Sequence, residues 1–420
     1  MLTQAPKGTK DVLPSESGKW QYIEGKVRDI CARFGYREIR TPVFEHTELF
    51  LRGVGDTTDI VQKEMFTFRD KGDRSVTLKP EGTAGAVRAF IEHGLYGGAQ
   101  PTKMYYLSSP IFRQEKPQAG RLREHHQFGI EVFGAPGPSV DMEVIMVALT
   151  LLCELGIKGL ALNINSIGCP SCRPAYNATL RGFLESRQGF CNDCVERMKT
   201  NPLRVLDCKE EKCRELTKDA PVMLDCLCDD CRAHFDGLKV RLEALGIAYA
   251  VNPHIVRGLD YYTKTVFEII STDIGAQGSV CGGGRYDGLV EQLGGPSMPG
   301  MGFGMGIERL LMVLESLDID LPKNDECEAY ICTLGETASV EGFRIASSLR
   351  NAGIRADIDH MGRSLKAQLK YAAKLGAHYV VILGEDELKN GTAVVRNMTA
   401  SEEKTVPIVE LNEYLKAGLQ

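Results

Sequence analysis

Side chains that can bind an anion lie together between two apolar runs in the first third of the sequence. The charged ones are Arg113, Glu115, Arg121 and Arg123. The flanking runs, residues 104–112 and 126–133, are rich in aromatic and β-branched residues, which predicts an antiparallel hairpin. Gln127 and Glu131 lie four residues apart on the second run, so both point to one face of the sheet. Guanidinium groups and acceptors therefore converge at one strand end, which suits an anionic ligand that also carries nitrogen; a charged loop in solvent is the alternative.

Two more arginines stand beside regular elements further along the chain. Arg257 opens the segment Arg-Gly-Leu-Asp-Tyr-Tyr, which leads into a strand-like run at residues 263–270. Arg309 lies in the segment MGFGMGIERLLMVL, where a glycine-rich approach leads into an amphipathic helix. A planar guanidinium can hold a phosphate or carboxylate group bidentately. An anion site is therefore one interpretation of Arg309, and a surface position paired with Glu308 is the other.

The alternating glycines before Arg309 superficially match a dinucleotide-binding pattern. They are Gly302, Gly304 and Gly306. The strand–turn–helix context of that pattern, with an acidic residue about 20 positions on, is missing. We interpret the glycines as positions where the backbone approaches a ligand or a neighbouring strand closely.

The remaining periodicities predict helices packed around a mostly antiparallel sheet. Helical spacing is found at residues 16–34, 84–93 and 139–155, and strand-like runs at residues 36–43, 65–68 and 75–78. Hairpins join most of the strands, and this favours antiparallel pairing in an α+β fold.

The pattern changes after a polar linker near residue 324. Strand-like runs at residues 329–334, 354–358 and 380–383 alternate with helical runs at residues 337–351 and 364–375. This alternation predicts a small α/β domain with parallel pairing. On its second helix, Lys366, Lys370 and Lys374 form with Arg363 a basic stripe. Such a stripe is usually a solvated face, and contact with RNA is the functional alternative.

Cysteines are concentrated in one segment of the chain. Nine of the 14 fall between residues 169 and 231. Eight form the pairs Cys169 and Cys172, Cys191 and Cys194, Cys208 and Cys213, and Cys228 and Cys231, with Cys226 left over. In a reducing compartment this spacing favours metal over disulfides, and eight thiolates could fill two tetrahedral sites for structural Zn²⁺. Buried free thiols are the alternative. The composition of residues 169–246 predicts a mostly helical insertion.

Composition excludes the disordered and membrane classes. Hydrophobic residues make up 43% of the chain and charged residues 25%, as in ordinary globular proteins. No apolar run approaches the roughly 18 residues that span a bilayer. The first residues lack the apolar core of a secretory signal, so we expect a cytoplasmic protein with no membrane partner. The net charge of −6 argues against indiscriminate binding of nucleic acid, although a local basic surface could still bind RNA.

The motifs in their order along the chain resemble the histidyl-tRNA synthetase family of class II aminoacyl-tRNA synthetases. The matching segments are KGTKD at 7–11, PEGT at 80–83, FRQE at 112–115, RGLDYYT at 257–263, GGRYDGL at 283–289 and GFGMGIERL at 302–310. The resemblance runs through essentially the whole chain. It implies a class II antiparallel sheet flanked by helices, a C-terminal α/β anticodon-binding domain, and a homodimer built partly from residues 36–43.

The resemblance also implies an activity and the residues that carry it. The reaction would join L-histidine to tRNA(His) through a histidyl-adenylate, with ATP and Mg²⁺ as substrate and cation. Arg113 and Arg257 would be catalytic, acting on the α-phosphate. Histidine would be bound by Glu81, Gly82, Thr83, Arg113, Gln127, Glu131, Arg257, Tyr261, Tyr262 and Tyr286. ATP would be bound by Arg113, Glu115, Arg121 and Arg309. Arg121 and Arg123 could instead reach the acceptor stem of tRNA.

Two questions about the predicted pocket stay open at this level. The sequence does not decide which carboxylate holds the α-amino group and which faces the imidazole. One of Tyr261 and Tyr262 could instead be buried in the sheet, because neighbours on a strand face opposite sides. The expected organisation is a catalytic core in residues 1–168 and 247–324, interrupted by the insertion in residues 169–246 and followed by an anticodon-binding domain in residues 325–420.

Three alternative functions would each require a different set of features. A non-catalytic, synthetase-like regulatory subunit of ATP phosphoribosyltransferase would lack the C-terminal domain and need not keep Arg113, Arg257 and Arg309. A pure RNA-binding module would not need the arginine constellation. A zinc-dependent nucleotide enzyme would need a catalytic His-Glu arrangement near the cysteines, and the sequence has none there.

Overall fold

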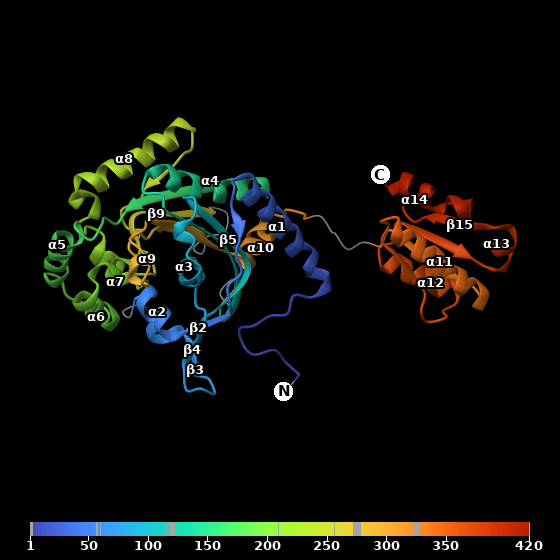
Figure 1. The fold of residues 1–420 in the computed structure, drawn as a ribbon, viewed down its shortest axis with the longest axis horizontal. Helices are drawn as coiled ribbons and strands as arrows, with labels where there is room; N and C mark the ends of the chain where they lie inside the picture. Colours follow the sequence, from blue (N-terminus) through green and yellow to red (C-terminus); the bar gives the residue numbers. More distant parts are fainter. Residues whose placement is uncertain are drawn as a thin grey trace. The chain divides into compact units, whose positions relative to one another are not determined.

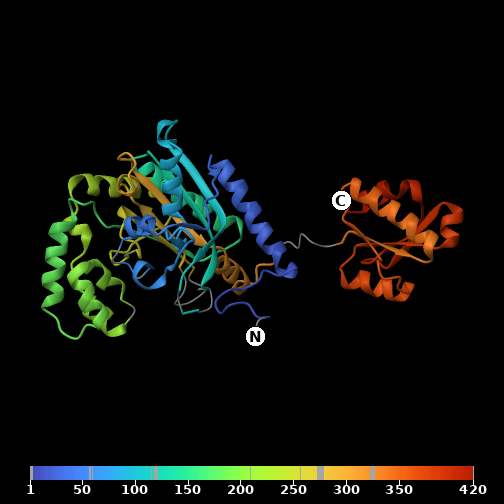
Figure 2. The same cartoon turned by 60° about the horizontal axis from the view of Figure 1, so that its bottom comes forward.

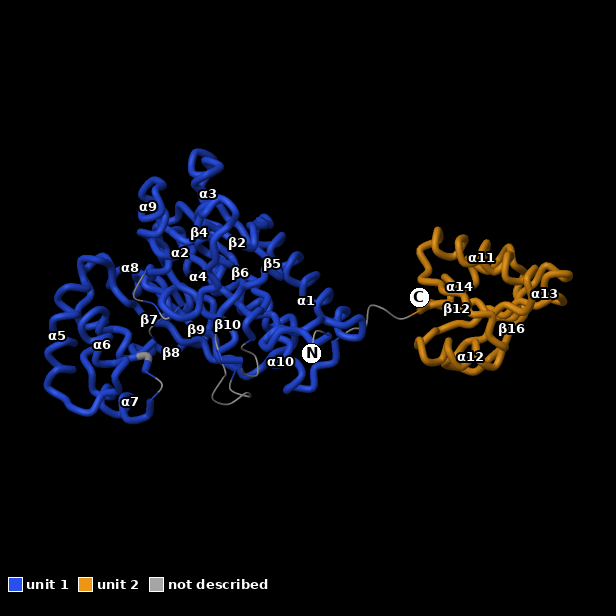
Figure 3. The backbone as a smooth tube through the Cα atoms, turned by 90° about the horizontal axis from the view of Figure 1, so that it is seen from below, with its two compact units in different colours: residues 1–321 blue, residues 322–420 orange. Residues whose placement is uncertain are grey.

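The computed structural model describes most of the chain in two compact units, residues 1–321 and residues 322–420 (Figure 3). The described residues are 3–55, 58, 60–114, 116–117, 122–208, 210–255, 257–271, 279–321 and 327–419. Each unit has its own hydrophobic core.

The first unit is built on an eight-stranded sheet (Figure 1). Its strands, in spatial order, are β1 (Arg37–Glu38), β5 (Thr102–Phe112), β6 (Glu124–Phe133), β11 (Gly300–Gly306), β10 (Ser279–Arg285), β9 (Thr263–Ser271), β7 (Leu160–Ser166) and β8 (Ala250–Val251). All neighbours are antiparallel except β1 with β5 and β7 with β8, at the two edges. The expected antiparallel sheet flanked by helices is confirmed.

Long helices cover one face of this sheet and bury its largest core. They are α1 (Pro14–Arg33), α4 (Pro138–Glu154), α8 (Asp229–Ala244) and α10 (Ile307–Ser316). The other face carries a second core, to which α3 (Thr83–Glu92) and α9 (Leu289–Gln292) contribute Val87, Phe90, Leu289 and Val290. Aromatic residues from the strand ends complete this second core, and the site described below lies on this face.

The early part of the chain differs from expectation at one strand. The run at residues 36–43 is a strand only at Arg37 and Glu38, followed by one more hydrogen bond to β5 from Ile39 N to Tyr105 O at 2.7 Å, so the predicted longer strand was wrong. The strand lies at the edge of the sheet and ends before Pro42, which has no backbone N–H for a ladder hydrogen bond. The chain continues instead into a three-stranded sheet with the order β2, β4, β3, whose strands are β2 (Phe44–His46), β4 (Ser75–Leu78) and β3 (Phe66–Arg69). Two short helical segments, α2 (Thr47–Val54) and η1 (Ile60–Glu64), lie between β2 and β3.

The insertion is helical, as predicted (Figure 2). Before α8 its elements are α5 (Arg173–Glu185), α6 (Asn192–Thr200), η3 (Pro202–Asp207), α7 (Glu211–Thr217) and η4 (Met223–Cys226). Its small core combines aliphatic side chains such as Leu180 and Val205 with many of the cysteines.

The second unit confirms the predicted parallel pairing of three strands, which two further strands extend into a mixed sheet. The strand order is β13 (Ala356–Ile358), β12 (Ala329–Thr333), β14 (Tyr379–Leu383), β15 (Thr392–Asn397) and β16 (Glu402–Pro407). The first three pair in parallel, while β15 and β16 continue the sheet as antiparallel strands. The helices are α11 (Glu336–Asn351), α12 (Leu365–Lys374), α13 (Glu385–Asn390) and α14 (Leu411–Leu419). β16 is mostly exposed and polar, and β15 buries only alternate residues, so neither strand stands out as an apolar run in the sequence.

Candidate active site

Three arginines that are far apart in the sequence line one cavity of about 240 Å³, which we call the arginine cavity. Arg113 follows β5, Arg257 lies in the loop before β9, and Arg309 lies in the first turn of α10. Backbone carbonyls fix two of them: Arg113 Nε donates to Pro80 O at 2.8 Å, and Arg309 Nη1 donates to Ser279 O at 2.9 Å. The concentration of positive charge makes this cavity suitable for a polyanion.

Arg257 lies flat across strand β10 because a glycine leaves room for it. A Cβ atom at Gly282 would lie 2.3 Å from Arg257 Nη1. The guanidinium is 3.8 Å from Glu268 Oε1 and 6.0 Å from the ring centre of Tyr262. Its Nε is buried and, within the described residues, has no hydrogen-bond partner. A partly exposed guanidinium whose Nε is buried and unsatisfied is well suited to bind an incoming carboxylate or phosphate group.

A buried carboxylate, Glu131, lies beside this cavity on β6. It is 1% exposed. Its Oε1 accepts hydrogen bonds from Thr83 Oγ1 at 2.8 Å and from the Tyr106 hydroxyl at 3.2 Å, while Oε2 accepts one from the Tyr286 hydroxyl. Burial raises the pKa of Glu131 to about 8, although the three hydroxyls oppose the shift.

A second buried carboxylate, Glu81, caps helix α3. Its two oxygens accept the backbone N–H groups of Thr83 at 2.8 Å and Ala84 at 2.7 Å, and the Tyr261 hydroxyl lies 3.4 Å away. Burial raises the pKa of Glu81, while these hydrogen bonds and the positive charge of Arg113 lower it. We refer to Glu81, Thr83, Tyr106, Glu131, Tyr261 and Tyr286 together as the buried acidic cluster.

The two adjacent tyrosines do not face opposite sides of the sheet. Strand β9 begins only at Thr263, so Tyr261 and Tyr262 lie in the preceding turn. Their ring centres are 4.8 Å apart, and Tyr261 also packs 5.6 Å from Tyr286. Both tyrosines therefore belong to the same buried face as the acidic cluster.

Glycines on β11 create the space for the polar side chains of β6. A Cβ atom at Gly302 would lie 2.1 Å from Glu131 Oε2, and one at Gly304 would lie 2.1 Å from Gln127 Nε2. Gln127 also lines the arginine cavity, and its buried Oε1 has no hydrogen-bond partner among the described residues. The close approach inferred from the glycine pattern is thus an approach to a neighbouring strand. At Gly82, likewise, a Cβ atom would lie 2.4 Å from the Tyr106 ring.

Sequence reasoning missed several residues of this region. Tyr106 contacts Glu131, His125 lines the arginine cavity, and Glu268 lies next to Arg257. The sequence does contain an indication of Tyr106, because the residue that pairs with it directly across the hairpin, Gly129, has no side chain.

Glu308, the residue before Arg309, is bound to His126 on β6. The Glu308 carboxylate accepts from the backbone N–H of His126 at 2.9 Å and lies 2.9 Å from its Nδ1. On the predicted hairpin loop, Arg123 is joined to the chain start by its backbone N–H, which donates to Gly8 O at 2.7 Å. Glu115 and Arg121 lie outside the described residues.

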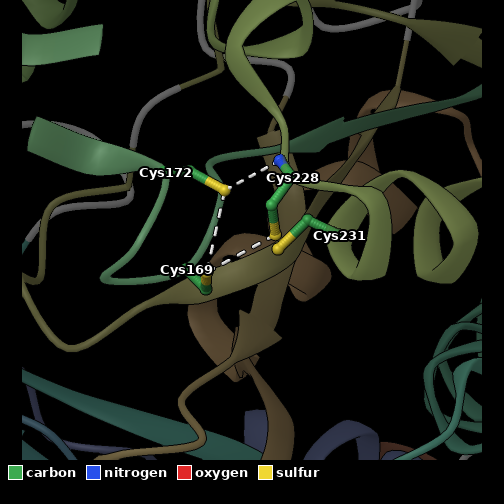
Figure 4. Close-up of side chains that lie close together, drawn as sticks. All are labelled: Cys169, Cys172, Cys228 and Cys231. Atoms are coloured by element: carbon green, nitrogen blue, oxygen red, sulfur yellow. Dashed lines mark hydrogen bonds between the residues drawn. The ribbon is translucent and has the colours of Figure 1, made fainter. Parts of the chain in front are cut away.

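The eight paired cysteines form two clusters. The base cysteine cluster joins the two ends of the insertion, and its members are Cys169, Cys172, Cys228 and Cys231 (Figure 4). The inner cysteine cluster consists of Cys191, Cys194, Cys208 and Cys213. In each, the four sulfur atoms lie within 4.8 Å of one another.

Backbone N–H groups also point at sulfur atoms in both clusters. Cys228 N lies 3.2 Å from Cys172 Sγ, and Cys191 N lies 3.3 Å from Cys213 Sγ. Four convergent thiolates are the ligand set of structural zinc, so the residues present fit this metal.

The basic stripe of the second unit is exposed. Lys366, Lys370 and Lys374 are exposed along α12, while the opposite face of the helix buries Gln368 and Ala372. The Arg363 side chain is instead paired with an acidic residue, because its Nη1 donates to Asp359 Oδ1 at 2.7 Å.

Comparison with known proteins agrees with this arrangement. A family model described as histidyl-tRNA synthetase matches residues 8–170 and 205–310, and one described as anticodon binding domain matches residues 328–418. The chain belongs to the histidyl-tRNA synthetase family. The part that the family model skips, residues 171–204, lies within the insertion and contains three of the paired cysteines.

Relatives in this family match over their whole length. The histidine–tRNA ligase of Caldanaerobacter subterraneus subsp. tengcongensis is 60% identical over 417 residues, which cover 99% of this chain and 100% of the relative. That of Clostridioides difficile is 55% identical and covers 100% of both chains. The crystal structure of apo histidyl-tRNA synthetase from S. aureus is similar with a TM-score of 0.84 and 40% identity, over 98% of this chain and 99% of the other.

None of the helices in the described residues combines the length and the apolar character that crossing a bilayer requires.

Proposed function

We propose that this chain is a histidine–tRNA ligase, which activates L-histidine with ATP to histidyl-adenylate and transfers the histidyl group to tRNA(His). The observation that carries the proposal is the convergence of Arg113, Arg257 and Arg309 on one cavity beside the buried acidic cluster. The family and the full-length similarity to ligases support the same activity. They also favour it over the non-catalytic regulatory subunit, because the anticodon binding domain is present.

The chemistry of activation fits three guanidiniums and no dedicated base. A carboxylate oxygen of histidine attacks the α-phosphorus of ATP, the bond to the β-phosphate oxygen breaks, and pyrophosphate leaves. The carboxylate is already ionised at neutral pH, so the site must supply alignment and positive charge. Arg113 and Arg257 do this at the α-phosphate. Arg309, on the far side of the cavity, binds the γ-phosphate end.

ATP binding needs further groups. Mg²⁺ accompanies the phosphates, because a hard cation suits their oxygens. Glu115 and Arg121 are assigned to the adenine amino group and the phosphates by resemblance to the family alone.

The histidine substrate lies along β6. Gln127 lines the arginine cavity, whereas Glu131 lies four residues further along the same strand face, among hydroxyls and tyrosine rings. The α-carboxylate must reach the arginines, so the side chain points toward Glu131, where an imidazole N–H can donate. Tyr261, Tyr262 and Tyr286 enclose the ring, and Glu81 with Thr83 faces the α-amino group. Such a polar pocket rejects side chains that leave its groups unsatisfied.

The cysteine clusters are proposed to hold two structural Zn²⁺ ions. The ions would close a small helical insertion whose own apolar core is limited. No catalytic step is assigned to them.

Several features of assembly and location are proposed with the function. The core comprises residues 1–168 and 247–324, and residues 325–420 bind the anticodon, with the lysine stripe as a contact surface. A homodimer is supported by the exposed apolar side chains of Val43 and Phe44, which are 42% and 52% exposed and lie at the end of the segment, residues 36–43, that the family resemblance assigns to the dimer interface. The enzyme works in the cytoplasm.

Pyrophosphate exchange with each of the twenty amino acids tests the assignment. We expect ATP formation only with histidine, and loss of exchange in Arg257→Ala. Exchange that depends on another amino acid, or its absence with all of them, would overturn the proposal.

A further inference from the structure

The loop at residues 257–262 is held on its outer side by two arginines of the insertion. The guanidinium of Arg173 donates a hydrogen bond to the carbonyl oxygen of Tyr262. Arg204 Nη2 donates to Gly258 O at 2.6 Å, and its Nε lies 3.4 Å from Asp260 Oδ1. Both ends of the loop are therefore fixed by guanidinium groups that come from outside the catalytic sheet.

On the side that faces the insertion, these contacts rather than close packing hold the loop, whereas Leu259, Tyr261 and Tyr262 pack into the second core on the other side. A cavity of about 210 Å³ remains between the insertion and the loop, and Arg173, Arg204, Asp260 and Arg257 all line it. Arg204 is 6% exposed, and the Nε of Arg173 is buried without a partner among the described residues. Moving either arginine would leave a charge buried and unsatisfied, so the arrangement depends on the elements that carry them.

Each arginine is anchored next to a cysteine cluster. Arg173 directly follows Cys172, a member of the base cysteine cluster, and is the first residue of α5. Arg204 lies in η3, which leads directly into Cys208 of the inner cysteine cluster. The insertion has short helices and a small core, and in domains of this kind a metal often fixes the helices in place.

We propose that Arg173 and Arg204 are positioning residues for the histidine-binding loop and that zinc in the two cysteine clusters holds them in place. The metal in the insertion thereby controls affinity for histidine at a distance from the reacting atoms. This inference rests on the proposed histidine activation and on the proposed zinc sites. Without metal, α5 and η3 lose their anchor, the loop loses its contacts with Arg173 and Arg204, and Arg257, Tyr261 and Tyr262 lose their alignment. Affinity for ATP changes little, because Arg309 and Arg113 lie on other elements.

The test compares arginines of the same chemistry inside the insertion. Arg173→Ala and Arg204→Ala remove the contacts to the loop. The matched control is Arg187→Ala, because Arg187 Nη1 also donates to a backbone carbonyl, that of Leu216 at 2.8 Å, but entirely within the insertion. The KM values for histidine and ATP are measured by pyrophosphate exchange, and zinc content by elemental analysis.

We expect each loop variant to raise the KM for histidine about tenfold, as expected for loss of a hydrogen bond from a charged group, with zinc content and the KM for ATP unchanged. The control is expected to change the KM for histidine less than about twofold. Equal effects of Arg173→Ala and Arg187→Ala on this KM would overturn the inference, since they would indicate general loosening of the insertion. Arg173→Lys, which keeps one donor, is expected to restore part of the affinity.

Treatment with a chelator distinguishes the effect of the metal from the effect of the arginine contacts. Removal of zinc from the wild type is expected to raise the KM for histidine, and the same treatment of the Arg173→Ala/Arg204→Ala double variant to add little. An equal further rise in the double variant would show that the metal acts by another route. A wild type without histidine-dependent exchange would refute the proposed function itself, whereas an active wild type with unaffected arginine variants would refute only this inference.

Discussion

The hydroxyl of Thr83 lies 2.8 Å from Glu131 Oε1, although 48 residues separate the two in the sequence. This hydrogen bond joins the first turn of α3 to the C-terminal part of β6 and places two carboxylates, Glu81 and Glu131, on one buried face. Because like charges in an apolar environment disfavour double ionisation, Glu81 contributes to the raised pKa of Glu131.

Stability should depend on pH through Glu131. Its pKa of about 8 in the folded chain exceeds the ordinary value of 4.5, so the folded state keeps a proton that the unfolded state releases. The stabilising contribution is full below about pH 4.5 and is lost as the pH rises toward 8, by up to about 1.4 kcal/mol per pH unit. The side chain of the Glu131→Gln variant remains neutral over the whole pH range. Urea denaturation of both proteins from pH 5 to 8 should therefore show the wild type losing stability relative to the variant, and parallel pH profiles would contradict the assignment.

Two glycine substitutions should distinguish an effect on folding from an effect on substrate binding. At Gly302, a new Cβ atom would lie 2.3 Å from the backbone oxygen of Ile130, which cannot move cheaply, so Gly302→Ala should lower the melting temperature by several degrees. At Gly304 the nearest atom is the flexible end of Gln127. Gly304→Ala should therefore stay folded but raise the KM for histidine about tenfold or more, measured by pyrophosphate exchange.

The control for these substitutions is Gly288→Ala, because a Cβ atom there meets nothing within 4 Å. It should change neither the melting temperature nor the KM for histidine appreciably. A Gly304→Ala protein with unchanged histidine kinetics would show that Gln127 does not bind the substrate.

The lysine stripe should act on tRNA and not on activation. Replacing Lys366, Lys370 and Lys374 by alanine should lower kcat/KM for tRNA by about tenfold to a hundredfold and flatten its salt dependence, because fewer phosphate contacts release counterions. Histidine-dependent pyrophosphate exchange should remain normal. Replacing the exposed Lys389 and Lys416 of the same unit is the matched control. Equal losses in both variants would argue for a diffuse effect of charge instead of a contact surface.

Metal analysis should find two zinc ions in each chain. Cys169→Ser should lose the ion of the base cluster and Cys213→Ser that of the inner cluster, because each site needs its four thiolates. Cys226→Ser, which changes the one insertion cysteine that belongs to neither cluster, should keep both ions. Less than one zinc for every two chains of wild type purified without chelators would refute the zinc sites.

The sequence alone determined the elements and the chemical inventory of this protein. Periodicity located the hairpin β5–β6 and most of the helices, because apolar side chains repeat at the spacing of each element. The motif order predicted a class II synthetase fold with an anticodon-binding domain, and cysteine spacing predicted two sites for four thiolates each. These features are local, so they can be recognised without knowledge of what lies next to them.

Only the tertiary structure decided which of these parts meet. It placed Arg113, Arg257 and Arg309 around one cavity, added Tyr106 to the carboxylate cluster, and divided the cysteines into a base and an inner cluster. It also decided the open question about Tyr261 and Tyr262, which do not alternate on a strand because β9 begins only after both of them, at Thr263. The physical reason is that strand order, the space left by glycines and the turns before strands are set by packing between distant segments, which no local pattern encodes.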